Sequence, residues 1–332
     1  MKHRVQGVAL VMVLIIVALI TIISTQLVTE RNLQARRTNN ILLSDNAWEF
    51  AIGAEILAKI VLIKSLKDKE TVNLSQPWAT DGIIFPIDGG NISAKITDLR
   101  SCFNLNGILA TEGSSKSENE DDQNSDQNNK PLAGEKVFRE LLHSLKLDDI
   151  NPIALASTLR DWVDKDQQPA GIDGKEDYEY SGYAQPYRTA DSLVGARSEL
   201  VTISGFSTEV LERLLPYVCF IPSDTTLVLN ANTIALDQPE LLSSFYDNLS
   251  IADAKSLLNS RPESGFEEED FNTQLPADAK LHKGTFINFS SSYFAVSTEV
   301  QLGRARVNLK SLLHYQSDKD DVVVLAHLGK DD

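Results

Sequence analysis

The N-terminal segment decides the fold of this chain. It reads MKHRVQGVALVMVLIIVALITIISTQLVTE over residues 1–30, and from Val8 to Ile23 every residue except Thr21 is apolar. At about 1.5 Å per residue, this run spans roughly 24 Å as a helix, a little less than a bilayer core. The residues up to Val28 can extend it. The sequence therefore predicts one membrane-spanning helix behind a short basic start.

The rest of the chain has the composition of a folded protein. The 332 residues are 42% hydrophobic and 23% charged, enough for one large or two smaller domains. The formal net charge is −16, whereas phosphate binding needs a cationic face, so we expect no nucleic-acid partner. The five histidines show no metal-ligand or triad spacing, and the chain has neither a Gly-x-Ser-x-Gly motif nor a phosphate loop.

Three interpretations compete for the first thirty residues. A cleaved secretory signal needs small residues after the apolar run, and Ile22 to Leu27 match that poorly. A plain signal anchor fits the cationic start with Lys2 and Arg4. The third is a leader that is cut on the cytoplasmic side, before the apolar run begins.

The third interpretation rests on a resemblance to type IV pilins and type II secretion pseudopilins. In these proteins a short basic leader ends in glycine, and Gly7 followed by Val8 resembles that site. The resemblance implies a leader peptide over 1–7, a cut by prepilin peptidase after Gly7, and N-methylation of Val8. Lys2 and Arg4 would keep the start in the cytoplasm, although Arg31, Arg36 and Arg37 beyond the span oppose this orientation.

Met12 narrows the resemblance to one subclass. Most pilins carry a glutamate at the fifth residue after the cut, where this chain has Met12. The K-type minor pseudopilin (general secretion pathway protein K) typically lacks that glutamate. In the fibre the glutamate neutralises the terminal ammonium of the subunit above, and a subunit at the tip has none above it. An unpaired carboxylate in lipid would be costly, so its absence suits a tip subunit.

The apolar run is predicted to continue as one long helix over 8–66. No Gly or Pro occurs from Val8 to Ile52. Apolar residues, four of them alanines, recur beyond the span at spacings of four, three, four and four: Ala47, Ala51, Ala54, Ala58 and Leu62. This stripe predicts a core-facing side, and other parts of the helix could pack on sister subunits.

The remaining residues alternate between strand-like and helical blocks. A β-like block over 67–107 contains a hairpin signal at Asp88–Asn91, and a second covers 281–332. Between them lie an inserted helical block over 108–222, with a polar loop at 111–130 that we expect to be disordered, and a helical continuation over 223–280. The prediction is an α+β fold. The long transmembrane helix packs on one antiparallel, pilin-like sheet that carries a large inserted all-α domain, which is the plan of K-type pseudopilins.

Two cysteines stand near the two ends of the inserted block. Cys102 precedes it and Cys219 lies near its end. They could be two buried thiols or one disulfide, and an oxidising compartment such as the periplasm favours the disulfide.

The densest chemical signal is the acidic stretch from Asp161 to Tyr178. Asp161 and Asp164 fall on one face at the end of a predicted helix, and Asp166 opens a Gly-containing loop. Oxygen ligands on a flexible loop suit a hard cation such as Ca²⁺, although the spacing is not that of an EF-hand and a merely solvated loop is the alternative. K-type pseudopilins contain a similar Asp-Trp-x-Asp-x-Asp stretch and bind calcium in the inserted domain. The resemblance implies these ligands: Asp164, Asp166, Glu176 and Asp177, with Asp161 and Asp173 as weaker candidates.

Two further stretches, Leu200–Tyr217 and Leu229–Arg261, resemble helix-hairpin-helix units of DNA-binding proteins. Such units usually need a Gly-x-Gly hairpin and nearby cations, which are missing here, so we interpret the pattern as helical packing only.

The expected function is structural. The resemblance implies a non-enzymatic minor pseudopilin at the tip of the type II secretion pseudopilus, which caps or initiates the fibre for export of folded proteins across the outer membrane. Its partners would be the I- and J-type minor pseudopilins, the major pseudopilin and prepilin peptidase, with the secretin or a substrate as further contacts. It would cross the bacterial inner membrane once, with its C-terminal domain in the periplasm. The alternative is a membrane-tethered periplasmic calcium-dependent hydrolase that uses paired carboxylates.

Overall fold

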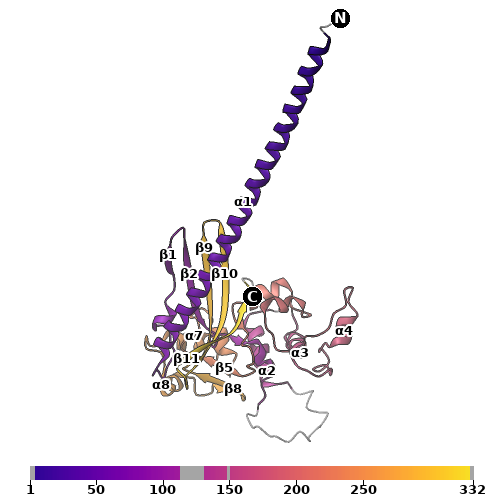
Figure 1. Ribbon diagram of the computed structural model, residues 1–332. Helices are drawn as coiled ribbons and strands as arrows, with labels where there is room; N and C mark the ends of the chain where they lie inside the picture. Colours follow the sequence, from indigo (N-terminus) through magenta and orange to yellow (C-terminus); the bar gives the residue numbers. More distant parts are fainter. Residues whose placement is uncertain (1–3, 113–130, 148–149, 330–332) are drawn as a thin grey trace.

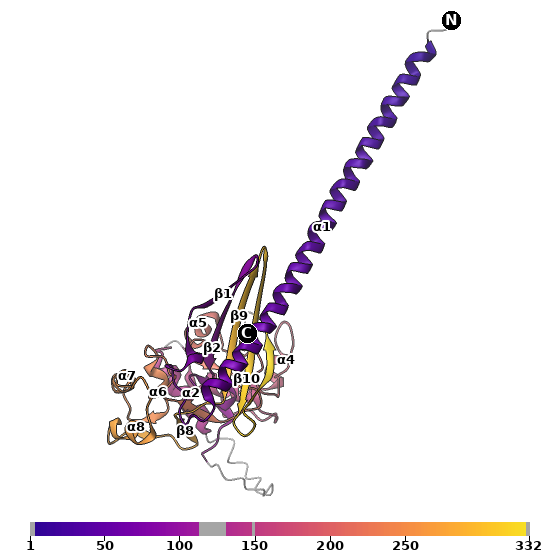
Figure 2. The same ribbon diagram turned by 60° about the vertical axis from the view of Figure 1, so that its left-hand side comes forward.

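The computed structural model describes residues 4–112, 131–147 and 150–329. Nearly all of the loop expected to be disordered, 113–130, therefore lies outside the described residues. A single long helix projects from a folded body that carries the sheet and the remaining helices (Figure 1, Figure 2).

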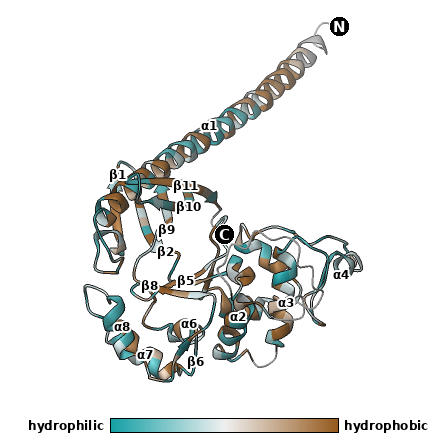
Figure 3. Ribbon diagram, turned by 90° about the horizontal axis from the view of Figure 1, so that it is seen from below, coloured by the Kyte–Doolittle hydropathy of each residue, from teal (hydrophilic) through white to brown (hydrophobic). Residues whose placement is uncertain are grey.

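The projecting helix is α1 (Arg4–Leu66), with 63 residues and a length of about 95 Å. Its N-terminal part contains an apolar window of mean hydropathy 2.7, none of which is buried in the chain. Figure 3 shows the apolar colours concentrated along this part of the helix. By length and composition, α1 fits a single-pass membrane anchor.

The body contains one five-stranded antiparallel sheet in the order β1-β2-β9-β10-β11. Its strands are β1 (Ile83–Ile87), β2 (Gly90–Asp98), β9 (Tyr293–Leu302), β10 (Ala305–Gln316) and β11 (Asp321–Leu328). The pairing of β2 with β9 joins the two β-like blocks across the whole inserted region. The predicted single antiparallel sheet is thus confirmed.

The second half of α1 packs on this sheet through the predicted alanine stripe. Ala47, Ala51, Ala54, Ala58 and Leu62 are all buried. The four alanines let the helix backbone come close to β9 and β10, which are its main neighbours.

A buried carboxylate fixes the position of α1 on the sheet. Glu55 is 5% exposed, accepts a hydrogen bond from the Ser311 hydroxyl of β10, and lies 2.7 Å from Nε2 of His327 on β11. Because a buried carboxylate without partners is costly, these contacts favour one register of helix and sheet.

The inserted helical part leaves the sheet after β2 and returns beside its own starting point. Its elements are β3 (Phe103–Asn104), η2 (Leu105–Leu109), α2 (Ala133–Ser144), α3 (Pro152–Val163), α4 (Asp177–Ser181), η4 (Arg197–Thr202), α5 (Thr208–Leu214) and β4 (Val218–Cys219). β3 and β4 pair in parallel, and a disulfide between Cys102 and Cys219 stands at this junction. Ser207 caps α5 as expected, since its hydroxyl accepts from the backbone N–H of Val210.

A second helical lobe follows between β4 and the sheet. It contains β5 (Leu227–Asn230), α6 (Pro239–Ser243), β6 (Tyr246–Asp247), α7 (Ile251–Asn259), α8 (Glu268–Gln274), β7 (Lys280–Leu281) and β8 (Thr285–Asn288). β8 pairs with β5 in parallel and β7 with β6, so the large sheet resumes only at β9. This differs from the expectation that 281–332 belongs wholly to the sheet. β5 is a buried strand whose backbone groups need hydrogen-bond partners, and the parallel pairing with β8 provides them.

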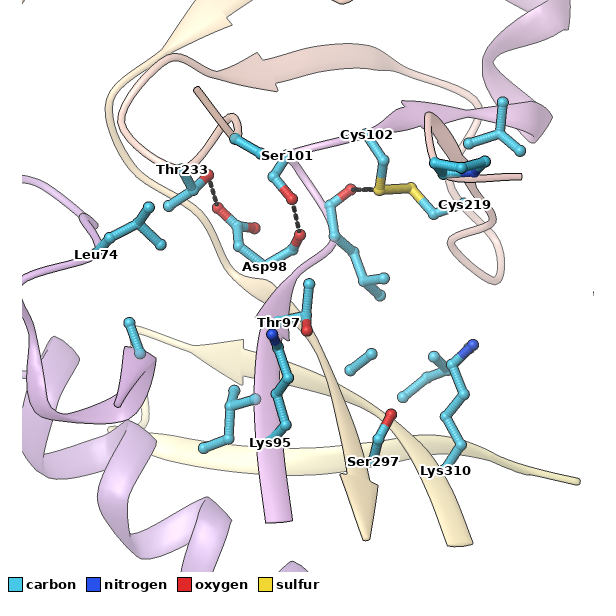
Figure 4. A pocket seen from close by; sticks show the side chains of 18 of the residues that line it. Leu74, Lys95, Thr97, Asp98, Ser101, Cys102, Cys219, Thr233, Ser297 and Lys310 are labelled. Carbon is cyan, nitrogen blue, oxygen red and sulfur yellow. Dashed lines mark hydrogen bonds between the residues drawn. A yellow bond between two sulfur atoms is a disulfide. The ribbon is translucent and has the colours of Figure 1, made fainter. Parts of the chain in front are cut away.

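Asp98 joins the sheet to the second lobe. The side chain is 2% exposed and accepts hydrogen bonds from Asn230 Nδ2 at 2.9 Å, Thr233 Oγ1 at 2.7 Å and Ser291 Oγ at 2.5 Å. Burial raises the pKa of this carboxyl. Figure 4 shows Asp98 and the disulfide on one side of a cleft whose other side is formed by Lys95, Ser297 and Lys310 of the sheet.

Candidate metal centre

The acidic stretch begins at the C-terminal end of α3. This helix starts cleanly because the Asn151 side chain accepts from the backbone N–H of Ile153 at 3.0 Å and Pro152 occupies the first turn. It ends at Val163, so Asp161 lies in its last turn and Asp164 directly follows it. The two carboxylates are three residues apart and therefore share one face.

Arg160 connects this end of α3 to α2 through Glu135 and also contacts Asp164. Arg160 Nη1 lies 3.2 Å from Oε2 of Glu135, which is 2% exposed, and Arg160 Nε lies 3.6 Å from Oδ2 of Asp164. Arg139 of α2 binds the other oxygen of Glu135 at 3.0 Å. One side of the Asp164 carboxylate is thus fixed by the protein.

Three of the predicted ligands converge. Asp164, Asp166 and Glu176 each offer a carboxylate oxygen, and these oxygens all lie within 4.8 Å of one another. Calcium binds oxygen at about 2.3–2.6 Å, so two of its ligands can be at most about 5 Å apart. The three carboxylates therefore fit around one such cation.

Several carboxylate oxygens in and beside this cluster are buried without a hydrogen-bond partner among the described residues. They are Oδ2 of Asp161, Oδ1 of Asp164 and both oxygens of Glu176. A buried polar atom left unpaired costs about 1–3 kcal/mol, and more when it is charged. A bound cation would satisfy these oxygens directly.

The electrostatics lead to the same conclusion. Burial, followed by repulsion from Asp161 and Asp164, raises the pKa of Glu176 to about 8. Burial and then repulsion from Asp166 raise the pKa of Asp164 to about 7. Without a cation, burial and the repulsion between these groups therefore disfavour the ionised form of both carboxyls near neutral pH.

Asp161 lies buried next to the cluster and binds the loop that follows it. It is fully buried, and its Oδ1 accepts from the backbone N–H of Ala170 at 2.9 Å. Burial raises its pKa to about 6. The loop passes so close that a Cβ on Gly174 would lie 2.4 Å from Asp161 Oδ2, which explains the glycine at this position.

The other two predicted ligands lie outside the three-carboxylate cluster. Asp177 Oδ1 accepts from the backbone N–H and the hydroxyl of Thr189 at 3.0 and 2.9 Å, and its Oδ2 lies 3.7 Å from Arg188. Asp173 is half-buried in a neighbouring groove that Arg139 also lines.

Asp191 is a contributor that sequence reasoning missed. Its charge raises the pKa of both Asp164 and Glu176, and its Oδ1 accepts from the Thr189 hydroxyl at 2.7 Å. Asp177 therefore helps to place Asp191 through Thr189. A single aspartate 25 residues beyond Asp166 in sequence carries no signal of its own.

The remaining predicted site residues are placed as follows. Gly7 and Val8 lie within the first turns of α1, and Met12 stands further along it with 61% of its surface exposed. Cys102 and Cys219 form a disulfide with Cα atoms 5.8 Å apart, across 117 residues of sequence.

Known proteins resemble this chain along nearly its whole length. Two family models described as type II secretion system (T2SS), protein K match residues 101–223 and 229–286. The type II secretion system protein K of Aeromonas hydrophila is 36% identical over 97% of this chain and 96% of its own length. Those of Pectobacterium carotovorum subsp. carotovorum and Pseudomonas aeruginosa are 33% and 31% identical, over 97% and 99% of this chain.

A solved structure has the same fold. The crystal structure of the GspK-GspI-GspJ complex from the type 2 secretion system of enterotoxigenic Escherichia coli contains a chain that matches with a TM-score of 0.74 and 26% identity. The match covers 89% of this chain and all of the other. The resemblance drawn from the N-terminal residues is confirmed, and the hydrolase alternative finds no support. The chain belongs to the type II secretion system protein K family.

Proposed function

We propose that this protein is the minor pseudopilin that caps and initiates the type II secretion pseudopilus, as a structural subunit without catalysis. The observation that carries the proposal is the long apolar helix with Met12 in place of a carboxylate, joined to a sheet that bears a large inserted helical part. A helix without that carboxylate cannot neutralise the terminal ammonium of a subunit above it. The bulk of the inserted part suits an end position.

The similarity to the GspK-GspI-GspJ complex supports the choice of partners. The chain would assemble with I- and J-type minor pseudopilins and, below them, with the major pseudopilin. The first half of α1 would lie in the bacterial inner membrane and the folded body in the periplasm. Contacts of the inserted part with the secretin or with an exported substrate belong to the same proposal.

Maturation at Gly7 tests the assignment. Prepilin peptidase would cut between Gly7 and Val8 and the new terminus would be methylated. In a strain that lacks its own copy, Gly7→Asp should leave a precursor that is still anchored in the membrane, longer by the leader on an immunoblot, and secretion should stop. Wild-type secretion by an uncut Gly7→Asp protein would contradict the proposal.

We also propose that the cation is calcium, held by Asp164, Asp166 and Glu176, with Asp161 and Asp191 adding negative charge. Carboxylates and free carbonyl oxygens are hard ligands, which Ca²⁺ prefers. Its role would be structural: it neutralises the buried Glu176, the half-buried Asp164 and the exposed Asp166, which the fold holds close together. If the full chain in detergent shows no higher melting temperature in millimolar Ca²⁺ than in EDTA, calcium is not the ligand.

A further inference from the structure

The sheet, the inserted part and the second lobe meet around a cleft of about 510 Å³ (Figure 4). The sheet lines it with Lys95 and Lys310, the inserted part with Arg197, and the second lobe with Thr233. Ligand sites commonly form where separate parts of a chain meet. The function proposed above makes no use of this cleft, and its edge and its charges indicate what could bind there.

The cleft contains an open strand edge, because β1 covers only part of β2. The pairing of the two strands begins at Ile83 with Ala94 and runs toward the hairpin turn, so among the described residues no strand pairs with Lys95 to Asp98 on this side. Gly82, directly before β1, has a φ of 74°, so the chain departs here from the extended line along β2. An open edge presents unpaired N–H and C=O groups, which another strand can use.

The alternation of the ladder identifies the backbone groups at this edge. Residues of an antiparallel strand point their N–H and C=O in turn to one neighbour and then to the other. Leu99 donates its N–H to the carbonyl of Tyr293 at 2.9 Å, so odd-numbered residues of β2 face β9, whereas Ile96 and Asp98 face the open edge. The Asp98 carbonyl accepts from the Ser101 hydroxyl at 2.6 Å. The N–H and C=O of Ile96 and the N–H of Asp98 make no backbone hydrogen bond among the described residues.

A row of polar and basic side chains runs across the sheet from this edge. Lys95, Ser297 and Lys310 are paired in register across β2, β9 and β10, so they lie on one face. It is the face away from α1, because the neighbouring Ile96 packs with Leu62 of that helix. In Figure 4 both lysine side chains extend from the sheet toward the cleft.

The charges of the cleft favour an anionic ligand. Lys95 contacts Asp81 at 3.1 Å, but both side chains are more than half exposed, and such a pair contributes little. Arg197 has its Nε buried without a hydrogen-bond partner among the described residues. The other lining acid, Asp98, is buried, and its carboxylate already accepts hydrogen bonds. Three cations thus gather at one place in a chain whose net charge is −16.

We propose that the cleft binds an extended, acidic peptide segment of a partner protein, which adds as a strand to the open edge of β2. Its backbone pairs with Ile96 and with the N–H of Asp98, along the line that β1 begins. The residue of the segment that lies opposite Lys95 points to the same face, where a carboxylate takes the place of Asp81. Backbone pairing gives such a site its affinity, and side chains at alternate positions give it selectivity.

An extended segment fits this site better than a helix or a free anion. A helix uses its backbone groups internally and has none to offer the edge at Ile96. A free anion such as phosphate could contact Lys95 and Arg197 but would leave the edge unpaired. Only an extended acidic segment satisfies the edge and the cations together. The proposal goes beyond the role in the fibre, since it gives the body of the chain a peptide-binding site of its own.

Synthetic peptides test the site with the purified full chain in detergent. The probe is an eight-residue peptide of alternating threonine and valine with one central glutamate, labelled with fluorescein and followed by fluorescence anisotropy. It should bind about tenfold tighter than its twin with lysine in place of glutamate. N-methylation of the backbone along one edge of the peptide should abolish binding, while the same change along the other edge should preserve it. Equal binding of the twins, equal effects of the two N-methyl series, or no binding at millimolar peptide would overturn the proposal.

Two charge-reversal variants locate the peptide on the chain. Lys95→Glu should weaken the glutamate peptide about tenfold and strengthen its lysine twin. Arg306→Glu is the matched control, because Arg306 is also more than half exposed, also contacts one acid, and lies on the same face of the sheet outside the cleft. It should bind both peptides as wild type does, and equal melting temperatures would show that both variants fold. A Lys95→Glu chain that binds like the control places the peptide elsewhere, and a peptide that binds only by separating dimers of the chain, detected by light scattering, identifies a second copy as the occupant; either result overturns the proposal.

Discussion

At the residue scale, the chain keeps several negative groups where negative charge is least stable. Asp161, Asp164 and Glu176 are buried near one another, and oxygens of all three lack hydrogen-bond partners among the described residues. A protein that only needed a solvated loop would leave such side chains in water. The arrangement is explained if a cation supplies the missing contacts, and two predictions follow from the charges involved.

Replacing one carboxylate of the cluster should weaken stabilisation by calcium without lowering the melting temperature of the metal-free chain. Glu176→Gln takes away a carboxylate whose ionised form is strongly disfavoured by burial, so in EDTA at pH 8 the variant should melt at least as high as wild type. Its stabilisation by calcium should shrink by about 1.4 kcal/mol or more, which is a tenfold loss of affinity. Asp173→Asn is the matched control and should keep the wild-type response. A full calcium shift in Glu176→Gln would exclude Glu176 as a ligand.

The pH dependence of the metal-free chain follows from the same pKa values. Asp161, Asp164 and Glu176 titrate at about 6, 7 and 8 in the fold and near 4 when unfolded, so the folded state binds more protons. Their contribution to the free energy of unfolding is greatest below about pH 4 and declines up to about pH 8. In EDTA, urea unfolding should therefore show this contribution falling from pH 5 to pH 8, and calcium should remove most of the fall. Glu176→Gln should flatten the profile, and an unchanged slope in that variant would contradict the assignment.

At the scale of elements, the sequence predicts what local pattern encodes. The spacing of Ala47, Ala51 and Ala54 predicts the buried face of α1, and alternation predicts β9 and β10. The sequence marks Asp164 and Asp166 as part of an acidic stretch because they are close together and flank a helix end, but their choice as ligands relied on resemblance. Glu176 was more distant, and its inclusion relied on resemblance.

What the sequence could not predict depends on contacts between distant segments. β8 resembles the sheet strands that follow it, but it pairs with the buried strand β5, more than fifty residues earlier. Asp191 reaches the acidic cluster only because Thr189 binds Asp177. Neither pairing leaves a local pattern.

The disulfide acts at this scale because it closes the inserted part where the chain leaves and returns. A closed loop of 117 residues predicts roughly 4–5 kcal/mol in the chain-entropy model, and measured losses are about 2–5 kcal/mol. The double variant Cys102→Ser with Cys219→Ser should lose stability in that range by urea unfolding. Adding a reductant to wild type should reproduce the loss, and adding it to the double variant should change nothing. Equal stability of wild type and double variant would contradict a stabilising bridge.

At the scale of the whole molecule, one chain combines a membrane helix, a sheet and two helical lobes. α1 joins the membrane to the sheet through Glu55 and the alanine stripe, and Asp98 joins the sheet to the lobe that follows the insert. A subunit of this shape can join a fibre from below through α1 and present its inserted part at the end.

The position of this chain in the fibre tests most directly whether it caps and initiates the pseudopilus. Full-length chain that carries an epitope at its C-terminus would be produced in a strain whose major pseudopilin is overproduced, so that pseudopili extend and can be isolated. Immunogold labelling in the electron microscope should then show label at one end of each fibre and nowhere along the shaft. Label spaced along the shaft, or fibres of normal number and length in a strain that lacks the chain, would contradict the proposal that this protein caps and initiates the pseudopilus.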